Sequence, residues 1–160
     1  MIDGVILVAT LVSAIGGGLV AGLFFAFSAC VMTALGRRLP AAHGIAAMQA
    51  INVAILNPVF LRLFVGTTAS SVLLAVTAPF GDEPGAIWRL VGGVLFVVGA
   101  FLVTVVCNVP LNDALAKVDP VSSEGARVWE RYLARWTAWN HVRTLAAGGA
   151  ATILTLALRS

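Results

Sequence analysis

Charge is the scarcest property of this sequence. Only 11% of its residues are Asp, Glu, Lys or Arg, whereas 60% are hydrophobic. A soluble domain normally has about a quarter charged residues, which cover its water-facing surface. So little charge excludes an ordinary soluble domain and indicates a surface that faces lipid. It also argues against nucleic-acid binding, because the basic residues gather in connecting segments instead of forming a patch on a folded surface.

Residues that bind metals or act as nucleophiles are also few. The chain has two cysteines, Cys30 and Cys107, and two histidines, His43 and His141. Two cysteines are too few for a disulfide framework or a structural zinc site. A haem held by both histidines is geometrically conceivable, but no haem attachment motif accompanies them. We therefore expect neither a metal nor a cofactor, and no serine or cysteine nucleophile motif is present.

Long runs without charge predict membrane-spanning helices. Among the stretches without a charged residue are residues 4–36, 63–80, 90–109 and 144–158. A bilayer core about 30 Å thick needs about 20 helical residues. The sequence therefore predicts a single all-α membrane domain over residues 1–160. We expect a four-helix bundle with spans at about 5–35, 59–80, 88–109 and 138–158. The first run lacks the basic start of a signal peptide and is expected to be retained as a helix.

Prolines interrupt the helical pattern at defined points. Asn57-Pro58 is expected to break a helix, because proline has no backbone N–H and clashes with the preceding turn. The segment from Pro40 to Leu56 is too short and too polar to span alone. We therefore expect a broken second helix whose first part lies at the membrane interface. Pro110 is expected to disturb the third helix, and Asp119-Pro120 to form a turn before a helix that resumes near Ser122.

Small residues recur at every fourth position of the first run. They are Ala14, Gly18, Gly22, Ala26, Cys30 and Ala34. Residues four apart lie on one face of a helix. Gly18 and Gly22 form a GxxxG pair, which lets another helix approach closely. We therefore expect this face of the first helix to be a packing seam.

Basic residues are divided unequally between the two ends of the predicted bundle. Two lie on the side of the termini, Arg89 and Arg159. Eight follow the first and third spans: Arg37, Arg38, Arg62, Lys117, Arg127, Arg131, Arg135 and Arg143. Because cytoplasmic loops carry an excess of Lys and Arg, we expect both termini outside the cytoplasm. The expected location is the bacterial cytoplasmic membrane.

Polar residues gather at the basic end of the predicted spans. A polar group inside a membrane is costly and is therefore a candidate for function. The predicted catalytic residues are His141, Arg143, Asn108 and Asn112. The predicted substrate-binding residues are Asn52, Asn57, Trp136, Trp139 and Asn140. Each also has a structural interpretation. The asparagines can cap helices, the arginines can reach lipid phosphates, and the tryptophans can lie at the membrane interface.

Taken together, these motifs resemble the anthrone oxygenase-like family of integral membrane proteins. The resemblance extends over nearly the whole chain. The matching segments are residues 22–28 (GLFFAFS) with 31–32, 48–52 (MQAIN) with 57–60 (NPVF), 108–112 (NVPLN) with Leu115, and 136–144 (WTAWNHVRT). Fungal members are associated with oxidising anthrones to anthraquinones in polyketide biosynthesis, without an evident metal or flavin. The resemblance implies a cofactor-independent monooxygenase whose partners are a hydrophobic aromatic substrate and O₂.

The chemistry of an anthrone suggests roles for the polar groups. A base removes a proton from the methylene opposite the ketone, and the resulting enolate can reduce O₂. We expect His141 to be the base, since an unperturbed histidine titrates near about 6.5. Arg143, with Asn108 or Asn112, is expected to stabilise the enolate oxygen, and the two tryptophans to stack on the flat substrate. Adjacent helical positions point about 100° apart, which can turn His141 away from Arg143.

A non-enzymatic membrane protein is the second interpretation. A small transport or assembly component would use the same polar cavity to bind a ligand or a partner. A sealed apolar pocket favours the enzyme, whereas a continuous polar path through the bundle favours transport. The sequence also leaves open whether the chain forms a homo-oligomer.

The distribution of basic residues leads to a test of topology. Reporter fusions at the C-terminus and after Ala116 should report opposite sides of the membrane, with the Ala116 fusion in the cytoplasm, because most basic residues adjoin it. A cytoplasmic C-terminus would contradict the orientation. If both fusions reported the same side, the number of spans between them would be wrong.

Overall fold

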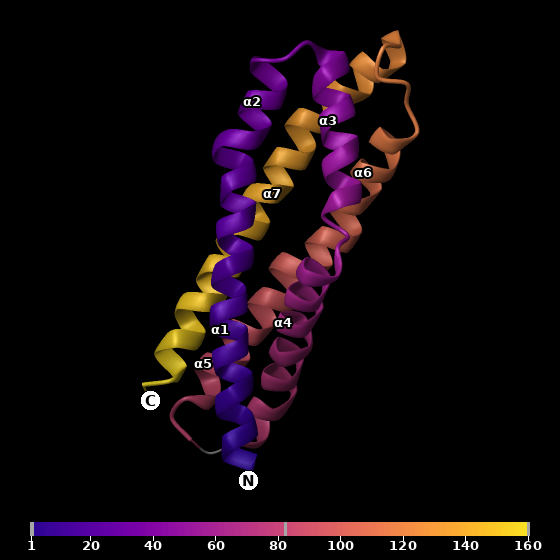
Figure 1. Cartoon of the computed structure of the whole chain (residues 1–160). Coiled ribbons are helices and arrows are strands. Elements are labelled where there is room, and N and C mark those ends of the chain that lie inside the picture. The colour runs from indigo at the N-terminus through magenta and orange to yellow at the C-terminus, as the bar shows by residue number, and fades with distance from the viewer. Residues whose placement is uncertain (1, 82, 160) are drawn as a thin grey trace.

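The computed structural model describes residues 2–81 and 83–159, and these residues are almost entirely helical. Helix makes up 88% of the structure, and no strand occurs among the described residues. The prediction of an all-α chain is therefore confirmed. Figure 1 shows long helical rods lying side by side, with the N and C labels at the same end of the molecule.

Each rod consists of one or more helices. The first contains α1 (Ile2–Ala26), the π-helical turn η1 (Phe27–Val31) and α2 (Met32–Arg37). The second contains α3 (Ala41–Ala54), α4 (Pro58–Thr77) and the 3₁₀ turn η2 (Ala78–Phe80). The third contains α5 (Ala86–Phe96), the π-helical segments η3 (Val97–Leu102) and η4 (Thr104–Asn108), and α6 (Val109–Ala116). The fourth is the 35-residue helix α7 (Ser123–Ala157).

The four rods form a closed ring in both halves of the molecule. In the half near the termini, α1 and α5 each contact both α4 and α7. In the opposite half, α3 contacts α2 and α6, and α7 contacts the same two helices. Helix α7 runs through both halves (Figure 1), so it connects them.

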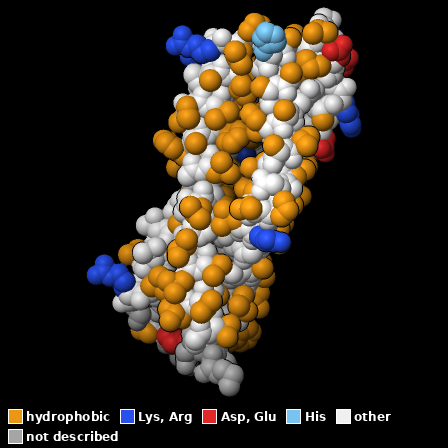
Figure 2. All heavy atoms as spheres, in the orientation of Figure 1, with side chains coloured by type: hydrophobic (Ala, Val, Ile, Leu, Met, Phe, Trp, Pro, Cys, Tyr) orange, Lys and Arg blue, Asp and Glu red, His pale blue; other side chains and the backbone are white. Residues whose placement is uncertain are grey.

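Three of the rods are long and apolar enough to cross a membrane. The segments are Gly4–Arg37, Pro58–Phe80 and Ala86–Ala116. Helix α7 is not among them, and its first half contains charged residues such as Glu130, Arg131 and Arg135. Figure 2 shows many hydrophobic side chains over this face of the molecule, with few charged ones among them. The chain is thus a membrane protein by composition, while the fourth span at 138–158 and the complete four-span bundle stay predictions.

The predicted break in the second rod is confirmed. Helix α3 ends at Ala54, and α4 begins at Pro58. The side-chain oxygen of Asn57 accepts hydrogen bonds from the backbone N–H groups of Val59 and Phe60, each at 3.0 Å. Proline at the first helical position loses nothing, because that N–H would have no helical partner. The second rod is therefore interrupted here, and α4 starts as a new helix that Asn57 caps.

Pro110 leaves the third rod continuous and changes its winding instead. Immediately before it, the N–H of Val109 donates to the carbonyl of Thr104, five residues earlier. This spacing is that of a π-helix, which often replaces one turn of an α-helix at functional sites. The rod then continues as α6 to Ala116, beyond the predicted end of the span near Val109.

The predicted packing seam on the first helix is wrong for this fold. Gly18 and Gly22 are exposed, and a Cβ atom added at either would meet nothing within 4 Å. The close contacts lie one or two positions earlier. Gly16 abuts Thr67, and a Cβ at Gly17 would lie 3.4 Å from the carbonyl oxygen of Ala147. Because each position rotates about 100° around the axis, this offset moves the contact to a different face of α1.

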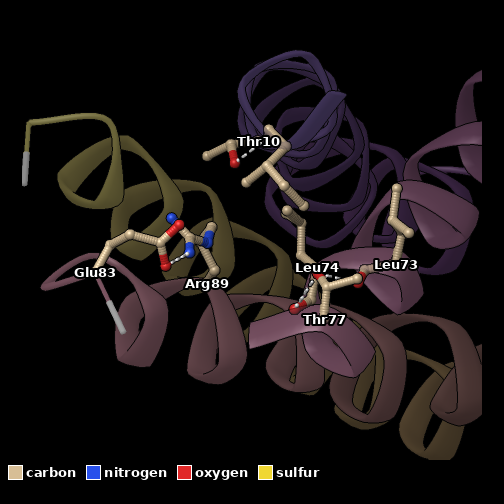
Figure 3. Close-up of polar contacts among 7 residues, drawn as sticks. Thr10, Leu73, Leu74, Thr77, Glu83 and Arg89 are labelled. Atoms are coloured by element: carbon tan, nitrogen blue, oxygen red, sulfur yellow. Dashed lines mark hydrogen bonds and ion pairs between the residues drawn. The ribbon is translucent and has the colours of Figure 1, made fainter. Parts of the chain in front are cut away.

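A close ion pair lies at the end of the molecule near the termini. Arg89 Nη2 lies 3.0 Å from Glu83 Oε2. Figure 3 shows the two side chains pointing toward each other. A hydrogen bond from its own backbone amide, and then the neighbouring Arg89, lower the pKa of the Glu83 carboxyl, so that the pair is charged at neutral pH. No other ion pair occurs in the described ranges. Apolar packing and hydrogen bonds therefore hold the rods together.

The glycine contacts generate a paired stability test. A Cβ at Gly93 would lie 2.6 Å from the backbone carbonyl oxygen of Ser71, so Gly93→Ala should force α4 and α5 apart. Overpacking of this kind costs about 1–3 kcal/mol. Gly18→Ala and Gly22→Ala should be neutral or slightly stabilising, because the new methyl groups meet open space and alanine favours helix. Thermal unfolding in detergent distinguishes them, and equal midpoints for all three would contradict this packing.

Candidate active site

A cavity of about 470 Å³ lies beside the break in the second rod. All four rods contribute to its wall, and most of the wall is apolar. Six aromatic side chains line it: Phe24, Phe27, Phe60, Phe64, Phe101 and Trp136. Six polar or charged residues also line it: Gln49, Asn52, Thr104, Asn112, Asp113 and Arg143. Figure 2 shows this face hollowed at mid-height. We call this cavity the central pocket.

The central pocket lies between two packed clusters. Met48 and Trp136 belong to the cluster of the half distant from the termini. Phe24 and Phe64 belong to the cluster of the other half. Phe60 and Phe64 are stacked, with ring centroids 5.5 Å apart and planes at 11°. One part of the pocket wall is therefore a pair of parallel rings, which suits a planar ligand.

Arg143 is the one basic residue that lines the pocket, and only 4% of it is exposed. Its Nη1 donates to Thr104 Oγ1 at 3.1 Å and its Nη2 to Asn140 Oδ1 at 2.6 Å. The guanidinium carbon lies 4.1 Å from the centroid of the Phe24 ring and 5.1 Å from that of Trp136. No carboxylate is paired with it in the described structure, and its buried Nε–H has no partner.

Asn140 holds the arginine in place. It is fully buried, and its side-chain nitrogen donates to the carbonyl of Phe24 and to the hydroxyl of Ser28, both at 2.6 Å. Its oxygen accepts from Arg143. Asn140 thus connects α7 to the first rod beside the π-helical turn η1, which contains Ser28. It supports the pocket from behind without lining it.

Asn112 organises a second group of hydrogen bonds. Its side-chain oxygen accepts from the hydroxyl of Tyr132 at 2.8 Å and from the indole N–H of Trp136 at 2.9 Å. Tyr132 is stacked between Trp129 and Trp136. Burial raises the pKa of the Tyr132 hydroxyl above its usual range, so it stays protonated and donates to Asn112. This group fixes the orientation of Trp136 at the pocket wall.

Two predicted site residues have structural positions instead. Asn57 is exposed and caps α4, as described above. Asn108 is buried, and its side-chain nitrogen donates to the backbone carbonyl of Trp136 at 3.2 Å. Asn108 does not line the pocket, and its side-chain oxygen has no partner. It ties the third rod to α7.

The structure does not bring His141 or Trp139 into the pocket. His141 is exposed, and Trp139 is 41% exposed. The reason is helical rotation. Trp136, Asn140 and Arg143 follow one another at spacings of four and three and turn one face of α7 inward. His141 is next to Asn140 in sequence and therefore points about 100° away. Of the predicted residues, the pocket collects Arg143, Asn112, Asn52 and Trp136.

Several lining residues had not been singled out in the sequence. Thr104 lies in a π-helical segment, and its position beside Arg143 depends on that irregular winding. Asp113 is exposed at the pocket wall, next to Asn112. Phe60 and Phe64 could have been found from the sequence. They lie four residues apart in the helix after Asn57-Pro58, and residues at that spacing share one helical face.

This arrangement favours binding of an anionic oxygen on a flat molecule. A buried cation without a carboxylate partner is costly unless other groups compensate. Here two neutral oxygens and two aromatic faces do so only in part, and one N–H remains free. No three His, Cys, Asp or Glu side chains in the described ranges lie together as a metal site.

Fold and site thus define an all-helical membrane protein with an aromatic pocket around a buried arginine. The sequence model of the anthrone oxygenase family matches residues 56–153, more than half of the chain. The chain belongs to that family. The matched region supplies Arg143 and Trp136, whereas the wall formed by α1 and α3 lies outside it. No curated protein and no solved structure matches the chain.

The hydrogen bonds of Asn140 lead to a stability test. Asn140→Ala leaves Arg143 Nη2 and the carbonyl of Phe24 without their partner, so unfolding should become easier by about 1–3 kcal/mol. His141→Ala, at the adjacent exposed position, should change stability by no more than about 0.5 kcal/mol. Both are measured by thermal unfolding in the same detergent. Equal losses would mean that Asn140 does not support the buried arginine.

Proposed function

We propose that this chain is a membrane-embedded, cofactor-independent oxygenase. Its substrate is a hydrophobic aromatic molecule of the anthrone type, derived from a polyketide. The observation that carries the proposal is the guanidinium of Arg143, which is buried in an aromatic pocket and has no carboxylate partner among the described residues. Membership of the anthrone oxygenase family supports the same reaction class.

Arg143 would act on the oxygen of the substrate. When an anthrone loses a methylene proton, negative charge moves to its ketone oxygen. A preorganised cation in a site sheltered from water stabilises such developing charge more than water does. The fixed aromatic walls, Phe60 and Phe64 among them, would hold the ring system flat while its oxygen meets Arg143.

The reaction needs only O₂ as the oxidant. The enolate carbon gives its electrons to O₂ and forms a C–O bond, which yields a peroxide at the former methylene. The peroxide O–O bond then breaks, a second C–H proton is lost, and a ketone remains. One oxygen atom stays in the quinone product and the other leaves as water. Electrons and atoms balance without a further reductant.

Asp113 takes the place of His141 as the proposed proton acceptor. It is the one carboxylate among the residues that line the central pocket. His141 is exposed and does not line the pocket. A base must come within hydrogen-bond reach of the proton that it removes. A substrate whose oxygen lies at Arg143 would direct its opposite, methylene side towards another part of the wall, and among the described lining residues Asp113 carries a carboxylate suited to accept the proton.

The packing around the pocket also favours an enzyme over a transporter. Between the pocket and the end of the molecule with the termini lies a tight apolar cluster that includes Val20, Phe96, Ala147 and Ala150. Such a barrier interrupts a polar path through the molecule. We place the protein in the bacterial cytoplasmic membrane, with the termini outside and the pocket towards the cytoplasmic side, because of the unequal basic charge.

Oxygen uptake with an anthrone in matched membrane preparations tests this function. Arg143→Lys keeps the charge but loses the planar fork of donors, and should lower the rate by about 10²–10³. Asp113→Asn should also lose most activity. Arg131→Lys, at an exposed position of the same helix, is the matched control and should behave as wild type.

The result for His141→Ala decides between the two proposed bases. Near-normal activity in His141→Ala together with loss in Asp113→Asn supports Asp113. The reverse result would return the role to His141. Full activity in Arg143→Lys would reduce Arg143 to a structural residue, and no uptake by the wild type would refute the oxygenase.

A further inference from the structure

The central pocket opens sideways, between the second and third rods. Six residues that line it are also exposed apolar side chains: Val53, Leu56, Leu61, Val65, Val105 and Val109. The first four come from the second rod on either side of its break, and the last two from the third rod. These six residues form the mouth of the pocket.

Backbone contacts explain why the rods part at this point. Farther from the termini, α3 contacts α6; nearer to them, α4 contacts α5 and η3. Between these two levels, α4 contacts neither η4 nor α6 within the described chain. The break at Asn57-Pro58 and the π-helical winding of η4 lie on the two sides of the gap. The mouth is therefore a consequence of the two helix irregularities.

Four of the six mouth residues lie in candidate membrane spans. Leu61 and Val65 lie in the candidate span Pro58–Phe80, and Val105 and Val109 in Ala86–Ala116. Their side chains are between 39% and 55% exposed on the outer flank of these helices. A rim of this composition repels a water-soluble molecule and accepts one dissolved in lipid.

We propose that the central pocket loads its ligand sideways from the bilayer, through the mouth between α4 and η4–α6. The ligand is a planar aromatic molecule with an ionisable, phenol-type oxygen. This proposal rests on the proposed function only for the use of the pocket as a binding site, and does not depend on the oxidation step.

The interior of the pocket indicates this occupant more strongly than a lipid acyl chain. An acyl chain would fill the apolar part but would leave the positive charge of the Arg143 guanidinium without a counter-charge. It would also gain little from the parallel rings of Phe60 and Phe64. A flat molecule with an acidic oxygen would satisfy both features, with its ring between the aromatic walls and its oxygen at the guanidinium.

The test uses the full chain in vesicles of neutral phospholipid. The probe is 1,8-dihydroxyanthraquinone, dissolved in the vesicle membrane, and its binding is followed by quenching of tryptophan fluorescence. Trp136 lines the pocket, so Trp136→Phe should remove most of the signal. The mouth variant is Val65→Phe with Val105→Phe. The matched control is Val72→Phe with Val98→Phe, which places the same residues at exposed positions of the same rods away from the pocket.

We expect the mouth variant to bind the probe at least about tenfold more slowly than wild type, and the control to match wild type. Equal rates in the mouth variant and the control would overturn sideways loading. Absence of quenching in the wild type, or equal displacement of the probe by a saturated fatty acid, would overturn the proposed ligand class. Slow binding in the mouth variant, in a chain that consumes no oxygen with an anthrone, would support this proposal and refute the oxygenase.

Discussion

A cation buried in an apolar molecule is the constraint on which the site depends. Arg143 has no acidic partner among the described residues; neutral groups from three rods, two aromatic rings among them, surround it. Thr104 comes from the third rod and Phe24 from the first, while Asn140 lies one turn earlier on α7. Removing a charge from water is expensive, and such a position is retained when the charge has a function. The proposed binding of a ligand oxygen therefore depends on this one side chain and on the aromatic wall around it.

The helical architecture followed from the sequence because its signals are local. Uncharged runs predict the apolar helices. At Asn57-Pro58, the asparagine caps the new helix, and the proline, which has no N–H, takes its first position. Ser122 caps α7 in the same way, by accepting from the N–H of Gly125. Trp136, Asn140 and Arg143 are buried on one face of α7 because they are spaced four and three residues apart. Local rules of this kind need no knowledge of the neighbouring rods.

The errors have the opposite origin, since they concern which face meets which neighbour. The stripe through Gly18 and Gly22 is a real pattern on α1, but the four-rod ring makes contact at Gly16 and Gly17 instead. A repeat of small residues shows where close approach is sterically allowed, and does not choose between faces that both allow it. The structure does not bring His141 into the pocket for a related reason. Its chemistry suits a base, but the inward positions of Asn140 and Arg143 set the rotation of α7, and the His141 side chain is exposed. Asp113, in a segment that looked merely polar, lines the pocket because the third rod continues past Pro110.

That continuation depends on the unusual winding of the third rod. In a regular α-helix, Thr104 and Asn112 would be separated by about 80° around the axis, since eight positions of about 100° exceed two turns by that amount. A π-helical turn holds more residues and rotates less per residue, which brings the two positions closer to one face. Both side chains line the central pocket, Thr104 against Arg143 and Asn112 against Trp136. The π-helical segment η4 before Pro110 thus has two consequences. It accommodates a proline within a continuous helix, and it aligns two polar side chains along the wall that faces the buried arginine.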